Sequence, residues 1–517
     1  MPDSSASAQG GKATRRDWIG LAVIALPCLL YSMDLTVLHL AVPSLSVELS
    51  PTSAELLWIV DIYGFLLAGS LITMGGLGDR IGRRRLLLIG ATAFGIASVM
   101  AAFSPTAEIL IASRALLGIA GATLAPSTLS LIRNMFLDPR QRTFAIGVWA
   151  ASYSAGAAIG PPLGGVLLEY FWWGSVFLVG VPVMLLLLVL GPRLLPEFRD
   201  EHARPLDLRS AALSLGAVLA VIYGLKEIAQ DGASFGSVTA IALGLLLGLV
   251  FARRQRRLAD PLIDLRLFRA PAFSVALAAN SLSLLTAFGI SLFVAQYLQL
   301  VLGLSPLVAG LWTIPSSGGF IAGSMLAPLA VRRLRPAVAI SFGLALAALG
   351  FALLTQVGEL GELPLLVAGH FTLALGIAPV VTLGTDIIVG AAPPERAGAA
   401  SAISETGAEL GGALGIAILG SIGTAVYRGA MTRALPNTAA PEAVEAARST
   451  LGAAVAMAEA LPDPAGTVLL ATAREAFTQS FQVSALVGVV ISIALAILVA
   501  VMLRQPRATL EARREAA

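Results

Sequence analysis

Long apolar runs separated by short polar segments dominate this sequence. A run of about 20 apolar residues is long enough to cross a bilayer as one helix, and fourteen such runs can be distinguished. The pattern therefore predicts an all-α integral membrane protein with fourteen transmembrane helices. The runs fall near residues 18–43, 55–78, 86–104, 107–130, 143–168, 172–192, 206–226, 235–252, 272–300, 306–330, 337–356, 363–390, 397–427 and 481–503.

The fourteen expected helices divide into two bundles of six once the two runs between residues 206 and 252 are set aside. We therefore expect a 6 + 2 + 6 organisation, with a pair of additional helices joining the bundles. The expected parts are a tail at 1–17, an N-terminal six-helix bundle at 18–198, two linker transmembrane helices within 199–258, a C-terminal six-helix bundle at 259–504 and a tail at 505–517.

The segment 428–480, within the C-terminal bundle, is too polar for a transmembrane helix but contains many alanines. We interpret it as an extracellular helical hairpin that precedes the last span. Because Pro436, Pro441, Pro462 and Pro464 interrupt the segment, a disordered loop is the alternative interpretation.

The overall composition excludes most soluble classes. The chain of 517 residues is 57% hydrophobic and only 13% charged, whereas soluble domains carry roughly 25% charged residues. Its mean hydropathy is +0.86. Most of the chain must therefore lie in lipid.

The distribution of basic residues predicts the orientation. Most of the 34 Lys and Arg residues fall in loops on one side of the expected spans, with the densest runs at 253–257 and 332–335. Basic loops face the cytoplasm, so both termini are expected there. The net charge of +3 is explained by these loops and requires no nucleic-acid partner.

Several kinds of chemistry find no support in the residue types present. Three His and one Cys offer no pattern for a zinc site, and no GxxxxGK loop for ATP occurs. We therefore expect no enzyme activity, no metal and no cofactor.

The first motif is GGLGDRIGRRRLL, residues 75–87, at the end of the second expected span. It resembles the loop between spans 2 and 3 of the major facilitator superfamily, and so implies the major facilitator fold. The positions that match include Gly75, Asp79, Arg80, Gly82 and Arg83. The resemblance implies that this loop takes part in conformational gating.

Arg114 is placed deep in the fourth span, where a charge costs several kcal/mol unless it is paired or hydrated. Its setting, RALLGIAGA, matches the superfamily pattern that implies proton transfer, and a structural charge pair is the alternative. Asp34 lies in MDLTVLHLAVP, which resembles the first-span motif of fourteen-span drug:proton antiporters. Counting about 1.5 Å per residue puts Asp34 and Arg114 at similar depth, so they could interact. We interpret His39 as a satisfied polar residue rather than a proton relay.

Span 5 contains GAAIGPPLGG, whose small residues four apart allow close helix approach. The stretch resembles the signature of antiporters in the superfamily, although packing alone could also explain it. The residues concerned are Gly156, Gly160, Pro161, Gly164 and Gly165.

Asp61 lies two turns into the second span, in WIVDIYGF, between Trp58 and Tyr63. This stretch resembles exporters of quaternary ammonium compounds and methyl viologen. Aromatic rings beside a carboxylate suit a lipophilic cation, so we expect these three residues to bind substrate. The alternative is an interfacial aromatic belt with an exposed acid.

Glu405 and Glu409 in span 13 are four residues apart and share one helix face. Two buried carboxylates so close repel each other when both are ionised, so we expect one of them to hold a proton and both to serve in cation binding or coupling. A structural role is the alternative. Asp386, Gln296 and Tyr297 are weaker candidates. Span 10 lacks the acid common in this subgroup, which implies a narrower substrate range, particularly for divalent cations.

Together these features predict a proton-coupled multidrug efflux antiporter in the cytoplasmic (inner) membrane of a bacterium. We expect it to export lipophilic cations, such as quaternary ammonium compounds, cationic dyes and biocides, by alternating access. The proton gradient would be its only drive, and its partners would be protons, cations and membrane lipids, with the protein itself a monomer. The alternative cargo is a neutral antibiotic or a lipid-like metabolite.

Overall fold

The structure of the chain is a computed structural model. It describes residues 13–199, 207–258, 261–358, 362–391, 397–434 and 441–503. Within these ranges the regular structure is helical, without strands, and twelve helical segments are long and apolar enough to cross a membrane. The all-α membrane fold expected from the apolar runs is therefore confirmed. The predicted tail 505–517 and most of the tail 1–17 lie outside the described residues.

Two of the fourteen predicted spans are helical but fall outside the twelve. The first corresponds to α6 (Pro139–Tyr170), whose many glycine, serine and proline residues lower its hydropathy. The second is broken into α12 (Pro306–Leu311) and α13 (Ile314–Ala330), each shorter than a full span. Fourteen spans thus remains a prediction.

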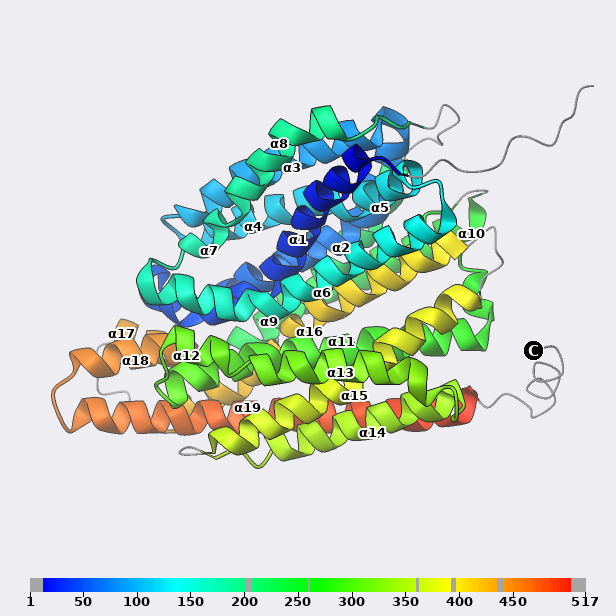
Figure 1. Ribbon diagram of the computed structural model, residues 1–517. Helices are drawn as coiled ribbons and strands as arrows, with labels where there is room; N and C mark the ends of the chain where they lie inside the picture. The colour runs from blue at the N-terminus through cyan, green and yellow to red at the C-terminus, as the bar shows by residue number, and fades with distance from the viewer. Residues whose placement is uncertain are drawn as a thin grey trace, which may run out of the picture.

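The first half of the chain forms one group of packed helices, drawn blue to green in the upper part of Figure 1. Within it, α1 packs along α6, and α3 packs against α4 and α8. Besides α6, its helices are α1 (Arg15–Leu49), α2 (Ser53–Ile81), α3 (Arg83–Ala102), α4 (Ala107–Gly121), α5 (Leu124–Met135), α7 (Ser175–Leu178) and α8 (Gly180–Leu194).

The second half forms a matching group in the lower part of Figure 1. Here α14 packs against α15 and α19, and α11 packs against α16. Besides α12 and α13, its helices are η1 (Leu267–Arg269), α11 (Pro271–Gln296), the π-helical turn η2 (Tyr297–Val301), α14 (Pro336–Leu354), α15 (Leu363–Gly390), α16 (Ala397–Ala434) and α19 (Ala465–Met502).

The two ends of the helix assembly differ. At the end that we call the terminal end, α1 begins at Arg15, α2 turns into α3 at Gly82, and α19 finishes at Met502. The opposite, hairpin end carries α17 (Pro441–Ser449) and α18 (Leu451–Ala460), within the predicted hairpin segment. Of that segment, residues 435–440 lie outside the described residues.

Contacts from α17 and α18 reach both groups of helices. The Tyr427 hydroxyl donates to the Ala447 carbonyl at 2.9 Å, and Ser53 at the start of α2 donates its hydroxyl proton to the Ser449 carbonyl. A Cβ on Gly452 would lie 2.8 Å from Ser46 Cβ of α1. The pair of short helices therefore closes over the ends of both groups.

The linker helices are α9 (Leu208–Asp231) and α10 (Phe235–Arg257). Helix α9 packs against α2 of the first group and α16 of the second, and lies near the middle of the assembly in Figure 1. Its Ile222 shares an apolar cluster with Phe65 and Ala413. Helix α9 therefore lies between the two groups and contacts both of them. Helix α10 packs against α9.

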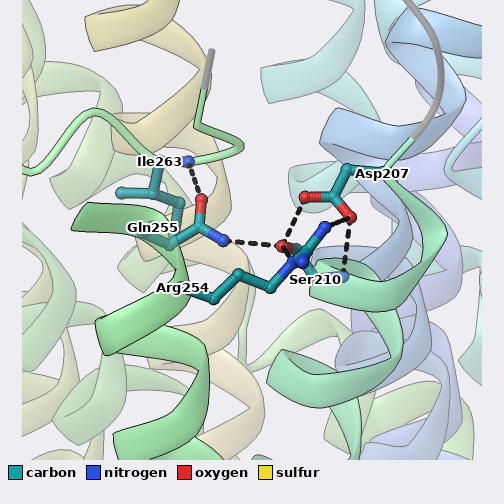
Figure 2. A network of polar contacts seen from close by, with 5 residues as sticks. All are labelled: Asp207, Ser210, Arg254, Gln255 and Ile263. Atoms are coloured by element: carbon teal, nitrogen blue, oxygen red, sulfur yellow. Dashed lines mark hydrogen bonds and ion pairs between the residues drawn. The ribbon is translucent and has the colours of Figure 1, made fainter. Parts of the chain in front are cut away.

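A polar network fixes α10 to α9 at the terminal end (Figure 2). Asp207 caps α9 by accepting from Ser210 N at 3.1 Å, and it also binds the Arg254 guanidinium at 2.9 Å. Gln255 donates to Ser210 Oγ at 2.7 Å and accepts from the Ile263 amide at 3.2 Å. The network therefore joins both linker helices to the segment that leads into α11.

The glycines of the predicted antiporter motif lie where α6 meets α1. A Cβ at Gly156 would stand 2.1 Å from the Leu29 carbonyl oxygen, and one at Gly160 would stand 2.3 Å from Thr36 Oγ1. Neither contact is possible for a real side chain, so only glycine permits this helix spacing. Gly164 meets Val37 in the same way, and Gly165 meets Pro306 of the second group.

The Asp207 network predicts a pH-dependent contribution to stability. Partial burial opposes ionisation of Asp207, but the hydrogen bonds from Ser210 and Arg254 outweigh it and lower the pKa of the carboxyl group below its ordinary value. The stabilisation is therefore complete above the pKa of the unfolded chain and disappears as pH falls through the lower native pKa.

We expect Asp207→Ala to cost about 1 kcal/mol of unfolding free energy at pH 7, because a helix cap and a partly buried ion pair are lost. Thermal unfolding of the detergent-solubilised protein at falling pH should show this difference shrinking. Asp207→Asn keeps a cap acceptor but no charge, and serves as the control. A difference that stays constant down to acidic pH would contradict the assignment to the carboxylate.

The α1–α6 contact predicts a sharp contrast between two glycines of one helix. Gly156→Ala should destabilise the protein by about 1 to 3 kcal/mol, because the added methyl overlaps backbone. Gly147→Ala should be neutral or slightly stabilising, since nothing lies within 4 Å of its Cβ position and alanine favours helix. Thermal unfolding of both variants checks this, and equal effects would refute the close-packing explanation.

Candidate functional site

A cavity of about 350 Å³ lies between the two groups of helices. Helices α1, α2 and α6 line it on one side, and α11, α13, α15 and α16 on the other. Most of the lining is apolar, including Leu35, Phe288 and Ile377. Its ionisable side chains are Asp61, Glu409, His39, His370 and Tyr153.

Glu409 is the acid through which the second group of helices contacts the first. It projects from α16, and its Oε1 accepts hydrogen bonds from the Tyr31 hydroxyl at 3.0 Å and the Tyr153 hydroxyl at 2.7 Å. Tyr31 belongs to α1 and Tyr153 to α6, with ring centroids 5.6 Å apart. The carboxyl group from the second half of the chain therefore accepts hydrogen bonds from two hydroxyls of the first half.

Glu405 lies one helical turn from Glu409, toward the terminal end. Its side chain is only partly buried, and it interacts electrostatically with Glu409 and with Tyr31 and Tyr153. Glu405 and Glu409 therefore lie on one face of α16, which is the arrangement expected from their spacing in the sequence. The two tyrosines were not identified from the sequence, because nothing local distinguishes them from other aromatic residues in spans.

Asp34 and Arg114 are in direct contact, as their similar depth in the sequence suggested. Arg114 Nη1 lies 2.5 Å from Asp34 Oδ2, and both side chains are buried. Two further guanidinium nitrogens donate to the carbonyls of Ile59 at 3.2 Å and Val60 at 3.4 Å. This satisfies the charge internally and links α1, α2 and α4.

Tyr63 belongs to this pair rather than to the cavity lining. Its ring lies under the Arg114 guanidinium, 4.6 Å from centroid to Cζ. Its hydroxyl donates to the Tyr31 carbonyl oxygen at 3.3 Å. Tyr63 therefore connects the Asp34–Arg114 pair to the tyrosine that holds Glu409, a different position from the substrate contact expected for it.

Asp61 and Trp58 lie together as expected, but a lysine occupies the place between them. The Lys226 ammonium, from α9, lies 2.9 Å from Asp61 Oδ1 and 2.8 Å from Oδ2. It also lies 3.6 Å from the centre of the Trp58 ring. Lys226 and Asp61 are each 1% exposed. Lys226 was not identified from the sequence, where it lies at the end of the apolar run 206–226.

The two cavity histidines were not assigned a function. The Nε2 atom of His39 is buried without a hydrogen-bond partner, so the expectation of a satisfied polar residue is wrong at this atom. The reason is that its neighbours across the cavity are mostly apolar. His370 of α15 also lines the cavity and was overlooked.

The weaker candidates lie away from the cavity. Asp386 is exposed on α15 near the terminal end. Gln296 donates to the Leu292 carbonyl of its own helix at 3.5 Å, and the Tyr297 hydroxyl donates to the Gly358 carbonyl. These contacts lie inside the second group of helices and stabilise its packing.

The predicted gating loop is anchored at several points. Arg83 binds Asp79 at 2.5 Å, and its backbone amide donates to the Phe198 carbonyl at 2.8 Å. Gly82 has a φ of +107°, and a Cβ there would meet Glu197 Oε1 at 2.5 Å. Glu197 was not foreseen, because it follows the sixth predicted span at a distance in sequence.

The remaining residues of that motif have simpler surroundings. Arg80 is exposed, and the Cβ position of Gly75 lies 3.7 Å from Pro126 of α5. Within the described ranges, no group of three or more His, Cys, Asp or Glu residues could hold a metal ion.

Known proteins resemble the chain over most of its length. It is 44% identical to the multidrug efflux pump LfrA of Mycolicibacterium smegmatis, over 95% of this chain and 97% of that protein. It is 40% identical to the methyl viologen resistance protein SmvA of Salmonella typhimurium, over 91% and 94% respectively. It is also 34% identical to the puromycin resistance protein pur8 of Streptomyces alboniger, over 82% and 85%.

A solved structure shares the fold at low sequence identity. The bacterial homologue of the human lysosomal transporter Spinster, in an inward-facing and unoccupied conformation, superposes with a TM-score of 0.65 and 18% identity, over 95% of this chain and 98% of that one. Residues 24–416 match the Major Facilitator Superfamily. The chain therefore belongs to the Major Facilitator Superfamily and is a multi-pass membrane transporter rather than an enzyme.

Proposed function

We propose that this protein is a proton-driven antiporter that exports lipophilic cations. The observation that carries the proposal is Glu409, a buried acid in an apolar cavity, which projects from the second half of the chain and accepts hydrogen bonds from two tyrosines of the first half. A buried carboxylate without a basic partner attracts either a proton or an organic cation. One group that can bind either, but not both, is the simplest basis for exchange.

Glu405 supplies a second acid in the same region. Because two carboxyl groups one turn apart repel each other when ionised, the pair readily keeps one proton and uses the other acid for the cation. A proton arriving from outside would neutralise the ionised acid and release the cation. The names of the relatives, which refer to multidrug efflux and to resistance, support an export direction.

Alternating access requires that the halves of the chain separate at one end while they close at the other. Several contacts between the halves lie toward the hairpin end. Gln299 donates to the Leu40 carbonyl at 3.0 Å, and the Leu307 amide donates to Glu169 at 3.4 Å. In the proposed mechanism these contacts break when the cavity opens at the hairpin end.

The Asp34–Arg114 pair is the proposed proton-coupling element. Protonation of Asp34 would leave Arg114 without its partner charge, and a buried unpaired cation is costly. Its backbone acceptors, the carbonyls of Ile59 and Val60, belong to α2, so the rearrangement would be transmitted to that helix and to the Asp79 loop at its end.

The remaining features of the proposal follow the sequence. The chain would cross the cytoplasmic membrane of a bacterium fourteen times, with both termini and the Asp79 loop in the cytoplasm and with α17 and α18 outside. Basic residues such as Arg253, Arg332 and Arg333 would then face the cytoplasm, as the charge rule requires. The antiporter would work as a monomer without a cofactor.

The proposal is tested in inverted vesicles with an acidified lumen. Addition of benzalkonium should release stored protons if cations and protons exchange. The double variant Glu405→Gln/Glu409→Gln should reduce the rate by about tenfold or more, while Glu459→Gln, an exposed acid of α18, should behave as wild type. The measurement is fluorescence of a pH-sensitive dye.

Two results would reject the assignment. Wild-type vesicles that contain folded protein but do not respond would favour a neutral antibiotic or lipid-like cargo. Normal exchange by the double variant would remove the two acids from the mechanism.

Asp34→Asn should uncouple proton release from cation binding. We expect the variant to bind tetraphenylphosphonium with near wild-type affinity, because Asp34 does not line the cavity, but to show no cation-driven proton release. Isothermal titration and the vesicle assay measure the two properties. Asp34→Asn/Arg114→Gln, which leaves no unpaired charge, is the control for stability. Unchanged proton release by Asp34→Asn would disprove its role.

A further inference from the structure

We propose that Lys226 determines the charge of the cargo: its ammonium neutralises Asp61 and thereby limits the cavity to cations with one positive charge, held at Glu409. The inference rests on the proposed function and specifies the substrate class at the same cavity. It concerns a residue of the linker helices, which the motifs of the two bundles do not include.

Lys226 occupies the position that a bound organic cation would take beside Asp61. Its ammonium contacts both carboxylate oxygens and lies over the Trp58 ring at 3.6 Å. A carboxylate together with an aromatic face is the arrangement that binds ammonium ligands. The expected substrate site at Asp61 and Trp58 is therefore a real cation site, and its occupant is a side chain of the same protein.

The position of Lys226 is fixed by the packing of α9. Gln230, one turn further along α9, accepts from the Ala54 amide at the start of α2 at 3.0 Å. A Cβ on Gly69 of α2 would lie 2.9 Å from Leu215 of α9. These contacts on both sides of Lys226 hold the helix against α2. The base of the Lys226 side chain is therefore fixed beside α2, and the side chain is 1% exposed at Asp61.

The charges around the cavity then sum in a simple way. Asp34 is compensated by Arg114, and Asp61 by Lys226. Glu405 and Glu409 have tyrosine neighbours but no ion pair among the described salt bridges. If one of these two acids keeps a proton, a single negative charge remains for the cargo. A cation with two charges would need Asp61 as well, and Lys226 holds it.

Removing the lysine charge should therefore admit a second positive charge. In Lys226→Met a similar volume remains, but Asp61, which lines the cavity, becomes available to the cargo. We expect affinity for the dication dequalinium to rise about tenfold relative to the monocation tetraphenylphosphonium. Binding of both probes to the purified full-length protein by isothermal titration measures the ratio.

Matched variants separate the charge effect from loss of structure. Lys226→Arg keeps the charge and should keep the wild-type ratio. Asp61→Asn leaves Lys226 unpaired beside the cavity and should weaken tetraphenylphosphonium binding by repulsion. Asp61→Asn/Lys226→Met removes both charges and leaves none unpaired, so it remains testable if either single variant does not fold. It should bind tetraphenylphosphonium within about threefold of wild type.

The outcomes are distinct. Loss of tetraphenylphosphonium binding in the double variant would mean that Asp61 itself holds the monocation, and would overturn the inference. An unchanged ratio of dequalinium to tetraphenylphosphonium affinity in Lys226→Met would also overturn it. Wild-type protein that binds neither probe and exchanges no protons would instead overturn the proposed function. Tetraphenylphosphonium binding by wild type with an increased dequalinium ratio in Lys226→Met would support both.

Discussion

The structure depends on one constraint, that a charge inside an apolar helix assembly must have a partner. Removing an ion from water costs several kcal/mol even after relaxation. Asp34 and two carbonyl oxygens offset this cost for Arg114. Asp61 and the Trp58 ring offset it for Lys226. Each pair joins helices distant in sequence. The polar groups needed for transport therefore also determine how α1, α2, α4 and α9 are placed.

Close helix packing makes these polar contacts possible. In lipid there is little hydrophobic drive to bring helices together, so small residues and tight packing take over that role. Gly156 and Gly160 bring α6 against α1, and this spacing lets Tyr31 and Tyr153 reach the same oxygen of Glu409. The glycine motif thus positions the site, although it contributes no chemistry of its own.

The candidate site could be predicted where the relevant spacing is local or the depth can be counted. Glu405 and Glu409 share a face because they are one turn apart, and Asp34 and Arg114 were placed at one depth by counting helical rise. Tyr63 and Lys226 could not be placed in this way. Their roles depend on which face of α2 meets α4 and which face of α9 meets α2, and neither follows from a single helix.

Most of the helices and the family could be predicted from the sequence, because apolar run length and local motifs act within one segment of chain. The packing of the helices sets the partner of each buried charge. It placed Lys226 on Asp61, Tyr31 and Tyr153 on Glu409, and Glu197 beside Gly82. The physical reason is that a desolvated charge selects its partner by distance in space, and that distance is set when helices far apart in the chain pack together.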